Sequence, residues 1–257
     1  MHKQFSTAGI PAVDLETCTL MDCRLHMGSC MIVSGPSSSG KTHFVLQVID
    51  NCRILFDIES DKVFWCYGHR TRMHEALVRK NFNMIQGLPT NFDFVTPNSI
   101  VVLDDLMVAP AKEAKVTELF TQAAHYVPCF IIKTTQNMFP RGRESRNHTL
   151  NTQYLVLFKN PADVTQINIL QYQMFPHSNN YLVAAFESAT KDKPHSYLLI
   201  DRHKLTADHI RVRTEILPVE APMIAYVDKR LYGGITTSKF LKTPRLNNPR
   251  HLESWQW

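Results

Sequence analysis

The 257-residue chain lacks any apolar run that approaches the about 20 residues needed to cross a bilayer as a helix. We therefore expect no membrane-spanning segment. The residues that follow Met1 also lack the apolar run of a signal peptide, so we expect a protein that is not secreted. The chain contains no internal repeat and no long low-complexity tract.

The chain also carries only a small excess of charge of one sign. The 28 basic and 23 acidic residues leave a net charge of +5, and 44% of the residues are hydrophobic. A small net charge with normal apolar content excludes intrinsic disorder as the overall state. The length suits one large domain, or a domain with appendages. A balance of +5 permits a nucleic-acid partner but does not require one.

Most of the positive charge lies near the C-terminus. Residues 228–257 carry six basic and two acidic side chains, a net +4 of the total +5, so residues 1–227 carry only +1. Gly, Pro and basic residues punctuate this stretch, and we expect it to be disordered or ordered only on a partner. We therefore divide the chain into a lead-in (1–29), a main domain (30–227) and a basic tail (228–257).

Six cysteines are too few for a disulfide scaffold in a chain of this length, so we expect reduced thiols. Cys18, Cys23, His26 and Cys30 are spaced much like the four ligands of a zinc site. Against that interpretation, Cys30 opens an apolar run that is typical of a buried strand, where free cysteine is common and inert. We favour burial over zinc.

Apolar runs alternate with segments of helical periodicity. The runs predict strands at 30–34, 62–67, 99–103, 129–135, 154–158, 197–200 and 210–216. The periodic segments predict helices at 42–51, 112–126, 163–174 and 181–190. This alternation indicates an α/β fold with a mostly parallel sheet and helices on both faces. Asp201 ends a late strand, and we expect it to act as a cap there.

Residues 35–42 read Gly-Pro-Ser-Ser-Ser-Gly-Lys-Thr, which fits G-x4-G-K-[ST]. The motif follows a predicted buried strand and opens a predicted helix, so a chance match is disfavoured. Such a loop cradles phosphates with backbone N–H groups, its Lys reaches the β- and γ-phosphates, and its hydroxyl ligates Mg²⁺. ATP and Mg²⁺ are therefore the expected cofactors. The residues predicted to bind nucleotide are Gly35, Pro36, Ser37, Ser38, Ser39, Gly40, Lys41 and Thr42.

Two carboxylates end the predicted strand at 99–103. Asp104 is expected to hold Mg²⁺ together with Thr42, and Asp105 to orient and deprotonate the attacking water. An Asp after a strand can equally be the N-cap of a helix. Beside a phosphate-binding loop we favour the catalytic interpretation.

Polar and basic residues follow the next strand. Gln136 comes directly after the strand at 129–135, where a side chain can contact the γ-phosphate or the attacking water. Arg141, Arg143 and Arg146 lie in the segment that follows. One of them could be an arginine finger for a neighbouring subunit, and the others could contact DNA phosphates. A solvated charged loop is the alternative.

These residues together resemble the genome-packaging ATPases of double-stranded DNA viruses and of virus-like Polinton (Maverick) elements, in the FtsK/HerA branch of P-loop ATPases. The resemblance runs from about Met31 to Val219. Its matching segments are Val33–Thr42, Trp65–Tyr67, Val101–Leu106, Thr135–Phe139, Thr149–Asn151, Tyr154–Pro161 and Gln173–Pro176. The phosphate-binding loop is generic, whereas the QN-x-F and YLVLFKNP segments are far more specific.

The resemblance implies a RecA-like fold and a ring-forming motor that drives double-stranded DNA into a preformed capsid. It implies a homo-oligomeric ring, a pentamer or a hexamer, that binds DNA without sequence preference and meets a capsid or portal protein. It also implies an intracellular protein of an infected host cell, in the nucleus, the cytoplasm or the virion. Where the family often carries arginines, this chain has Ala162 and Tyr172. Arg146 is therefore the first candidate for the finger, followed by Arg143 and Arg141.

Two other functions stay open. A small-molecule P-loop kinase would share the loop and could use 141–146 as a phosphate-covering lid. The tandem Asp104-Asp105 fits water activation better than transfer to a bound hydroxyl. A nucleotide-gated assembly module without sustained turnover would share the loop as well. We favour the ATP-driven DNA translocase.

Overall fold

The computed structural model describes residues 22–60, 62–68, 77–78, 80–106, 110–125, 127–138, 150–161, 165–178, 180–191, 193–220, 222–228 and 237–239. The helices in these ranges are α1 (Lys41–Asp50), α2 (Cys52–Leu55), α4 (Pro110–His125), α6 (Thr165–Met174) and α7 (Tyr181–Ala189), with a 3-10 turn η1 (Asp208–Ile210). The strands are β1 (Cys30–Ser34), β2 (Lys62–Tyr67), β3 (Asn83–Gln86), β4 (Ser99–Asp104), β5 (Phe130–Thr135), β6 (Tyr154–Phe158), β7 (Tyr197–Asp201), β8 (Val212–Thr214), β9 (Ile224–Tyr226) and β10 (Thr237–Lys239).

The described strands form a 10-stranded sheet in the order β10-β9-β8-β7-β6-β1-β5-β4-β2-β3. Parallel pairings join β3, β2, β4, β5, β1 and β6, and antiparallel pairings add β7, β8, β9 and β10 beyond β6. The strand before the phosphate-binding loop, β1, is central and is separated from β4 by β5. This is the strand order of RecA-like P-loop NTPases, and the predicted fold class is confirmed.

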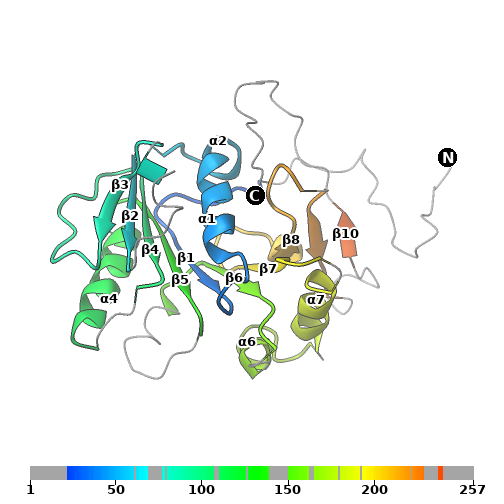
Figure 1. Cartoon of the computed structure of the whole chain (residues 1–257). Coiled ribbons are helices and arrows are strands. Elements are labelled where there is room, and N and C mark those ends of the chain that lie inside the picture. The colour runs from blue at the N-terminus through cyan, green and yellow to red at the C-terminus, as the bar shows by residue number, and fades with distance from the viewer. Residues whose placement is uncertain are drawn as a thin grey trace.

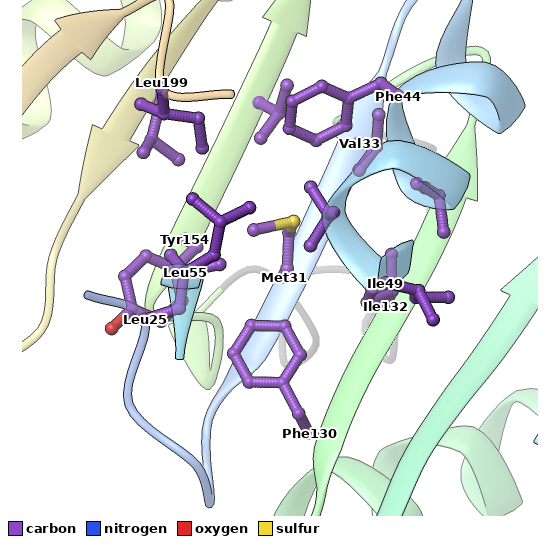
Figure 2. Close-up of a cluster of buried hydrophobic side chains, with 14 of the residues drawn as sticks. Leu25, Met31, Val33, Phe44, Ile49, Leu55, Phe130, Ile132, Tyr154 and Leu199 are labelled. Atoms are coloured by element: carbon purple, nitrogen blue, oxygen red, sulfur yellow. The ribbon is translucent and has the colours of Figure 1, made fainter. Parts of the chain in front are cut away.

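Helices cover both faces of the sheet because neighbouring side chains of each strand alternate between two apolar clusters. One cluster lies under α1: Phe44 and Ile49 pack on Met31, Val33 and Ile132 of the central strands, as Figure 2 shows. The other cluster lies under α4, α6 and α7, which Figure 1 shows on the opposite side of the sheet from α1. The strands between them are buried on both faces, which is why they read as continuous apolar runs.

Most predicted elements are present within one or two residues of their expected ends. Five elements were not expected: α2, β3, η1, β9 and β10. Each spans only three or four residues and gives too short a run for a periodicity to register. The strand predicted at 210–216 is shorter, because η1 precedes it and only Val212–Thr214 pairs with β7 and β9.

The C-terminal part of the chain also differs from expectation at one place. Thr237–Lys239 forms β10 and pairs with β9, so this segment belongs to the sheet although it lies in the stretch expected to be disordered or to need a partner. The other residues from 229 onward, and residues 1–21, lie outside the described ranges. The division at 30 and 228 stays a prediction. Among the described helices, none is both long and apolar enough to cross a bilayer.

A buried ion pair joins the two antiparallel strands next to the parallel half of the sheet. Arg213 Nη2 of β8 lies 2.7 Å from Asp201 Oδ2 of β7, and the two side chains are 1% and 0% exposed. Asp201 Oδ1 also accepts the backbone N–H of His203 at 2.9 Å. Asp201 therefore does cap the strand end, as expected, but it also neutralises a buried guanidinium, which the sequence pattern did not indicate.

We predict that Asp201→Asn lowers the free energy of unfolding by about 3–5 kcal/mol, because it leaves the Arg213 charge buried without a counter-charge. Urea unfolding of the purified chain measures the change. Asn keeps an oxygen for the His203 N–H, so the loss reports the charge. The control is Arg53→Gln, which removes the exposed pair between Arg53 and Glu59 and should leave stability unchanged. Equal effects of the two substitutions would contradict the assignment.

Candidate functional site

The phosphate-binding loop connects β1 to α1 in the middle of the sheet (Figure 1). The backbone N–H of Gly35 donates to the carbonyl of Thr135 at 3.1 Å, which ties the start of the loop to β5. A Cβ at Gly35 would lie 2.6 Å from Phe158 Cβ and 2.8 Å from Ser39 Oγ. Only glycine therefore allows the loop to pass β6 and fold back on itself.

The loop ends at Gly40, which caps α1 with a φ of 100° that side chains rarely adopt. The first intrahelical bond runs from Phe44 N–H to the Gly40 carbonyl at 2.9 Å, so the N–H groups of the first turn have no partner within the helix. The first turn carries no acidic residue. The N-terminus of α1 thus presents partial positive charge and backbone donors, which favour a bound anion such as a phosphate.

Lys41 lies across the loop. Its Nζ donates to the carbonyls of Gly35 and Pro36, at 2.8 Å each. Burial lowers the pKa of the Lys41 ammonium, and the charges of Asp105 and Asp104 act against this shift. The Lys41 ammonium thus places a positive charge beside the Gly35 and Pro36 carbonyls, within the electrostatic influence of the two carboxylates.

A line of hydrogen bonds connects the first helical turn to the ends of two strands. Thr42 Oγ1 donates to Asp104 at 3.2 Å to Oδ1 and 3.4 Å to Oδ2. Thr134 Oγ1 of β5 donates to Asp104 Oδ1 at 2.8 Å, and it accepts the backbone N–H of Asp105 at 2.8 Å. The structure therefore brings the two residues predicted to hold the metal together, and the hydroxyl of Thr134 fixes both aspartates to β5.

Asp104 and Asp105 differ in exposure although they are neighbours. Asp104 is buried, 7% exposed, on the face of the sheet that α1 covers, whereas Asp105 is exposed just beyond the strand. Asp105 has a φ of 45°, a left-handed conformation that Asp tolerates better than most residues. Neither residue begins a helix, because the chain at Leu106 is irregular. The alternative role as a helix N-cap is not what the structure shows.

Gln136 directly follows β5, the strand between β1 and β4, and its side chain is exposed. It therefore lies at the same end of the parallel strands as Thr42 and Asp104, and its contact with the γ-phosphate or the attacking water stays a prediction. Arg141, Arg143, Arg146 and Ala162 lie outside the described residues. Tyr172 is 76% exposed on α6.

The cysteines of the alternative zinc site point to different sides of the sheet. Cys30 is buried under α4, where its thiol donates to the Phe120 carbonyl at 3.7 Å, and burial raises its pKa. Cys23 packs against the cluster on the opposite face, and His26 Nδ1 lies 3.0 Å from Asp57 Oδ2. Cys18 lies outside the described residues. Cys30 is therefore a residue of the apolar core, as its apolar run predicted.

Two residues of the site were not predicted from the sequence. Thr134 sits two residues before Gln136, and strand alternation would have placed it on the same face as Asp104 once the pairing of β4 and β5 was known. His195 reaches the loop from the turn before β7, where its Nδ1 lies 3.1 Å from the Ser39 carbonyl oxygen. No local pattern around His195 indicates this contact, which depends on tertiary structure.

No protein-family model matches the sequence, and no curated protein sequence matches it. Among solved structures, the chain is similar to the genome-packaging NTPase B204 of Sulfolobus turreted icosahedral virus 2, in complex with ATP-γS. The identity is 11%, the match covers 73% of this chain and 96% of B204, and the TM-score is 0.41.

It is also similar to the KaiC-like protein PH0186 of Pyrococcus horikoshii OT3, at 14% identity over 78% of this chain and 90% of that one, with a TM-score of 0.41. A third similar structure is the RadB recombinase, at 16% identity over 51% of this chain and 74% of that one, with a TM-score of 0.34. At such identities a likeness concerns the fold alone.

The residues present fit a nucleotide with its metal. The loop and the N-terminus of α1 offer backbone donors, and Lys41 adds a cation for a polyphosphate. The Thr42 hydroxyl and the Asp104 carboxylate are hard oxygen ligands of the kind that Mg²⁺ prefers, and they lie within hydrogen-bond distance of each other. The chain has the fold and the loop of a P-loop NTPase.

We predict that Thr134→Val lowers NTP turnover about tenfold, equivalent to about 1.4 kcal/mol, because it removes the hydroxyl that positions both aspartates. Steady-state phosphate release measures the effect. Thr121→Val is the matched control, since Thr121 Oγ1 donates to the Thr117 carbonyl on the exposed face of α4. Equal turnover in the two variants would show that the Thr134 hydroxyl does not support the site.

Proposed function

We propose that this protein is an ATP-hydrolysing double-stranded DNA translocase that packages the genome of a virus or a virus-like element into a preformed capsid. The observation that carries the hydrolytic part is the line of hydrogen bonds from Thr42 through Asp104 and Thr134 to Asp105. The resemblance of the QN-x-F and YLVLFKNP segments to packaging ATPases supports the DNA-translocating part.

Binding of ATP uses groups that the loop holds in fixed positions. The backbone of residues 35–40 and the first turn of α1 face the phosphates, and Lys41 exchanges its bonds with the Gly35 and Pro36 carbonyls for phosphate oxygens. Thr42 and Asp104 would hold Mg²⁺, which supplies neutralisation of the negative charge on the β- and γ-phosphates. Asp104 is buried and tied to Thr134, so it offers a pre-oriented carboxylate.

Hydrolysis then requires a water positioned for attack on the γ-phosphorus. Asp105 follows Asp104 at the sheet edge and is exposed, so its carboxylate can accept the proton of the attacking water. Gln136, at the end of the strand between β1 and β4, is suited to orient that water or to contact the γ-phosphate. The oxygen of the water bonds to phosphorus, the bond to ADP breaks, and inorganic phosphate leaves.

The arginines after β5 give the proposal its oligomeric part. Arg146 would act on the ATP of a neighbouring subunit, and Arg143 and Arg141 would contact DNA phosphates inside a ring of five or six subunits. All three lie outside the described residues. Because residues 1–227 carry a net charge of only +1, binding to DNA has to come from the local charge of residues 141–146 or from the basic tail.

The proposal places the protein in an infected host cell, in the nucleus, the cytoplasm or the virion, where it would meet a capsid or portal protein. A ring that grips the DNA backbone is insensitive to base sequence and weakens as salt rises, because counterions compete with the protein for phosphates.

We predict that duplex DNA of any sequence stimulates phosphate release from ATP and that the stimulation falls as salt rises. Lys41→Ala abolishes both ATP binding and turnover. Asp105→Asn lowers turnover at least about 100-fold but retains ATP binding, because it removes the proton acceptor and leaves the phosphate-binding loop unchanged. Phosphate release and ATP binding, each measured for the wild type and both variants, check this.

The competing functions give different results in the same assays. Full DNA-stimulated turnover in both variants would overturn the proposal. A phosphorylated nucleoside or nucleoside monophosphate, formed in proportion to ATP consumed, would favour a kinase. Tight ATP binding by the wild type without phosphate release, even with DNA present, would favour an assembly module.

A further inference from the structure

We propose that His195 is a positioning residue for the phosphate-binding loop: its imidazole holds the Ser39–Gly40 peptide so that the Gly40 N–H points toward the bound phosphates. The inference rests on the proposed binding of nucleotide at this loop. His195 lies in the turn between α7 and β7, more than 150 residues from the loop in sequence, and its Nδ1 is 3.1 Å from the Ser39 carbonyl oxygen.

The peptide group between Ser39 and Gly40 has a fixed geometry. A trans peptide is planar, and its C=O and N–H point in opposite directions. The imidazole lies at the Ser39 oxygen, so the N–H of the same peptide, which belongs to Gly40, points away from the imidazole. The backbone N–H groups of such a loop are the donors that bind phosphate oxygens. Holding the carbonyl therefore fixes the direction of a phosphate donor.

The side chain of His195 also lies close to Gly40. A Cβ at Gly40 would lie 3.2 Å from His195 Cβ and 3.3 Å from His195 Nδ1. Gly40 also has a φ of 100°, which only glycine adopts without strain. Two independent features, a hydrogen bond and a close packing contact, thus place His195 on the same peptide.

The turn that carries His195 holds the residue in an uncommon conformation. His195 itself has a φ of 61°, a left-handed backbone conformation that costs free energy for a residue other than glycine. Ser196 Oγ donates to the Lys193 carbonyl at 2.7 Å and closes the turn. Lys193 in turn forms an ion pair with Glu215, which follows β8. Strain of this kind persists only where the surrounding contacts impose it.

The neighbouring residue connects the same turn to α1. Tyr197 begins β7 and is buried, and its ring packs against Phe44 of α1 with a centroid separation of 4.6 Å. Its hydroxyl donates to Glu220 Oε2 at 2.8 Å. The antiparallel strands beyond β6 therefore contact the loop through His195 and the helix through Tyr197, and they brace the nucleotide site from the side away from Asp104.

The contact requires a proton on Nδ1, because a carbonyl oxygen only accepts. The neutral Nδ1–H tautomer and the imidazolium both meet this requirement. Asparagine meets it as well, since its amide nitrogen is two bonds from Cβ, as Nδ1 is, and Asn tolerates a positive φ. Glycine tolerates the same φ but offers no donor. The pair His195→Asn and His195→Gly therefore separates the hydrogen bond from the backbone conformation.

Calorimetry measures the equilibrium binding of ADP and of inorganic pyrophosphate to the full chain, without DNA. We expect His195→Gly to weaken both ligands by about tenfold, the loss of one hydrogen bond, and His195→Asn to bind within about twofold of the wild type. The matched control is Asn98→Gly, which alters a residue with a φ of 61° before β4, at the opposite sheet edge, and should bind like the wild type.

The outcomes separate this inference from the proposed function. If the wild type and His195→Gly bind ADP with equal affinity, the proposed role of His195 is wrong and the nucleotide site still stands. A loss for ADP without a loss for pyrophosphate would also overturn it, because His195 would then act on the nucleoside. Failure of the wild type to bind ADP would instead contradict the proposed function. In turnover assays, His195→Gly should raise KM and leave kcat near the wild-type value.

Discussion

The structure of the site depends on one buried hydroxyl. Thr134 Oγ1 donates to the Asp104 carboxylate and accepts the N–H of Asp105, so one side chain of β5 sets the position of the last residue of β4 and the first residue beyond it. Asp104 then reaches Thr42 at the start of α1. A buried carboxylate is tolerated only with such donors around it, and the cost of leaving it without them stabilises this arrangement of the three elements.

The strand order explains why these elements meet. β5 lies between β1, which leads into the phosphate-binding loop, and β4, which ends in the two aspartates. Parallel strands bring their carboxyl ends to one edge, so the loop, Asp104 and Gln136 all lie at that edge. The opposite ends of these strands carry structural groups, such as the stacked rings of His26 and His203. The site is thus a consequence of topology, with the apolar clusters on both faces holding the strands in register.

Much of this could be predicted from the sequence. The runs at β1, β4 and β6 are apolar because both faces are buried, and the glycines and lysine of the loop follow from the chemistry of phosphate binding. Short strands such as β3 and β9 could not be predicted, because a run of three or four residues carries little periodicity. Thr134, Arg213 and His195 depend on which strands pair and on a turn remote in sequence, and no local pattern reports these.

The proposed hydrolysis requires Thr42 and Asp104 to hold a metal ion beside a nucleotide bound in the loop. Electron paramagnetic resonance tests this requirement with Mn²⁺ in place of Mg²⁺. The free ion is titrated with protein and a non-hydrolysable ATP analogue. We expect nucleotide-dependent Mn²⁺ binding in the wild type and its loss in Asp104→Asn. Unchanged Mn²⁺ binding in Asp104→Asn, at equal nucleotide occupancy, would contradict it.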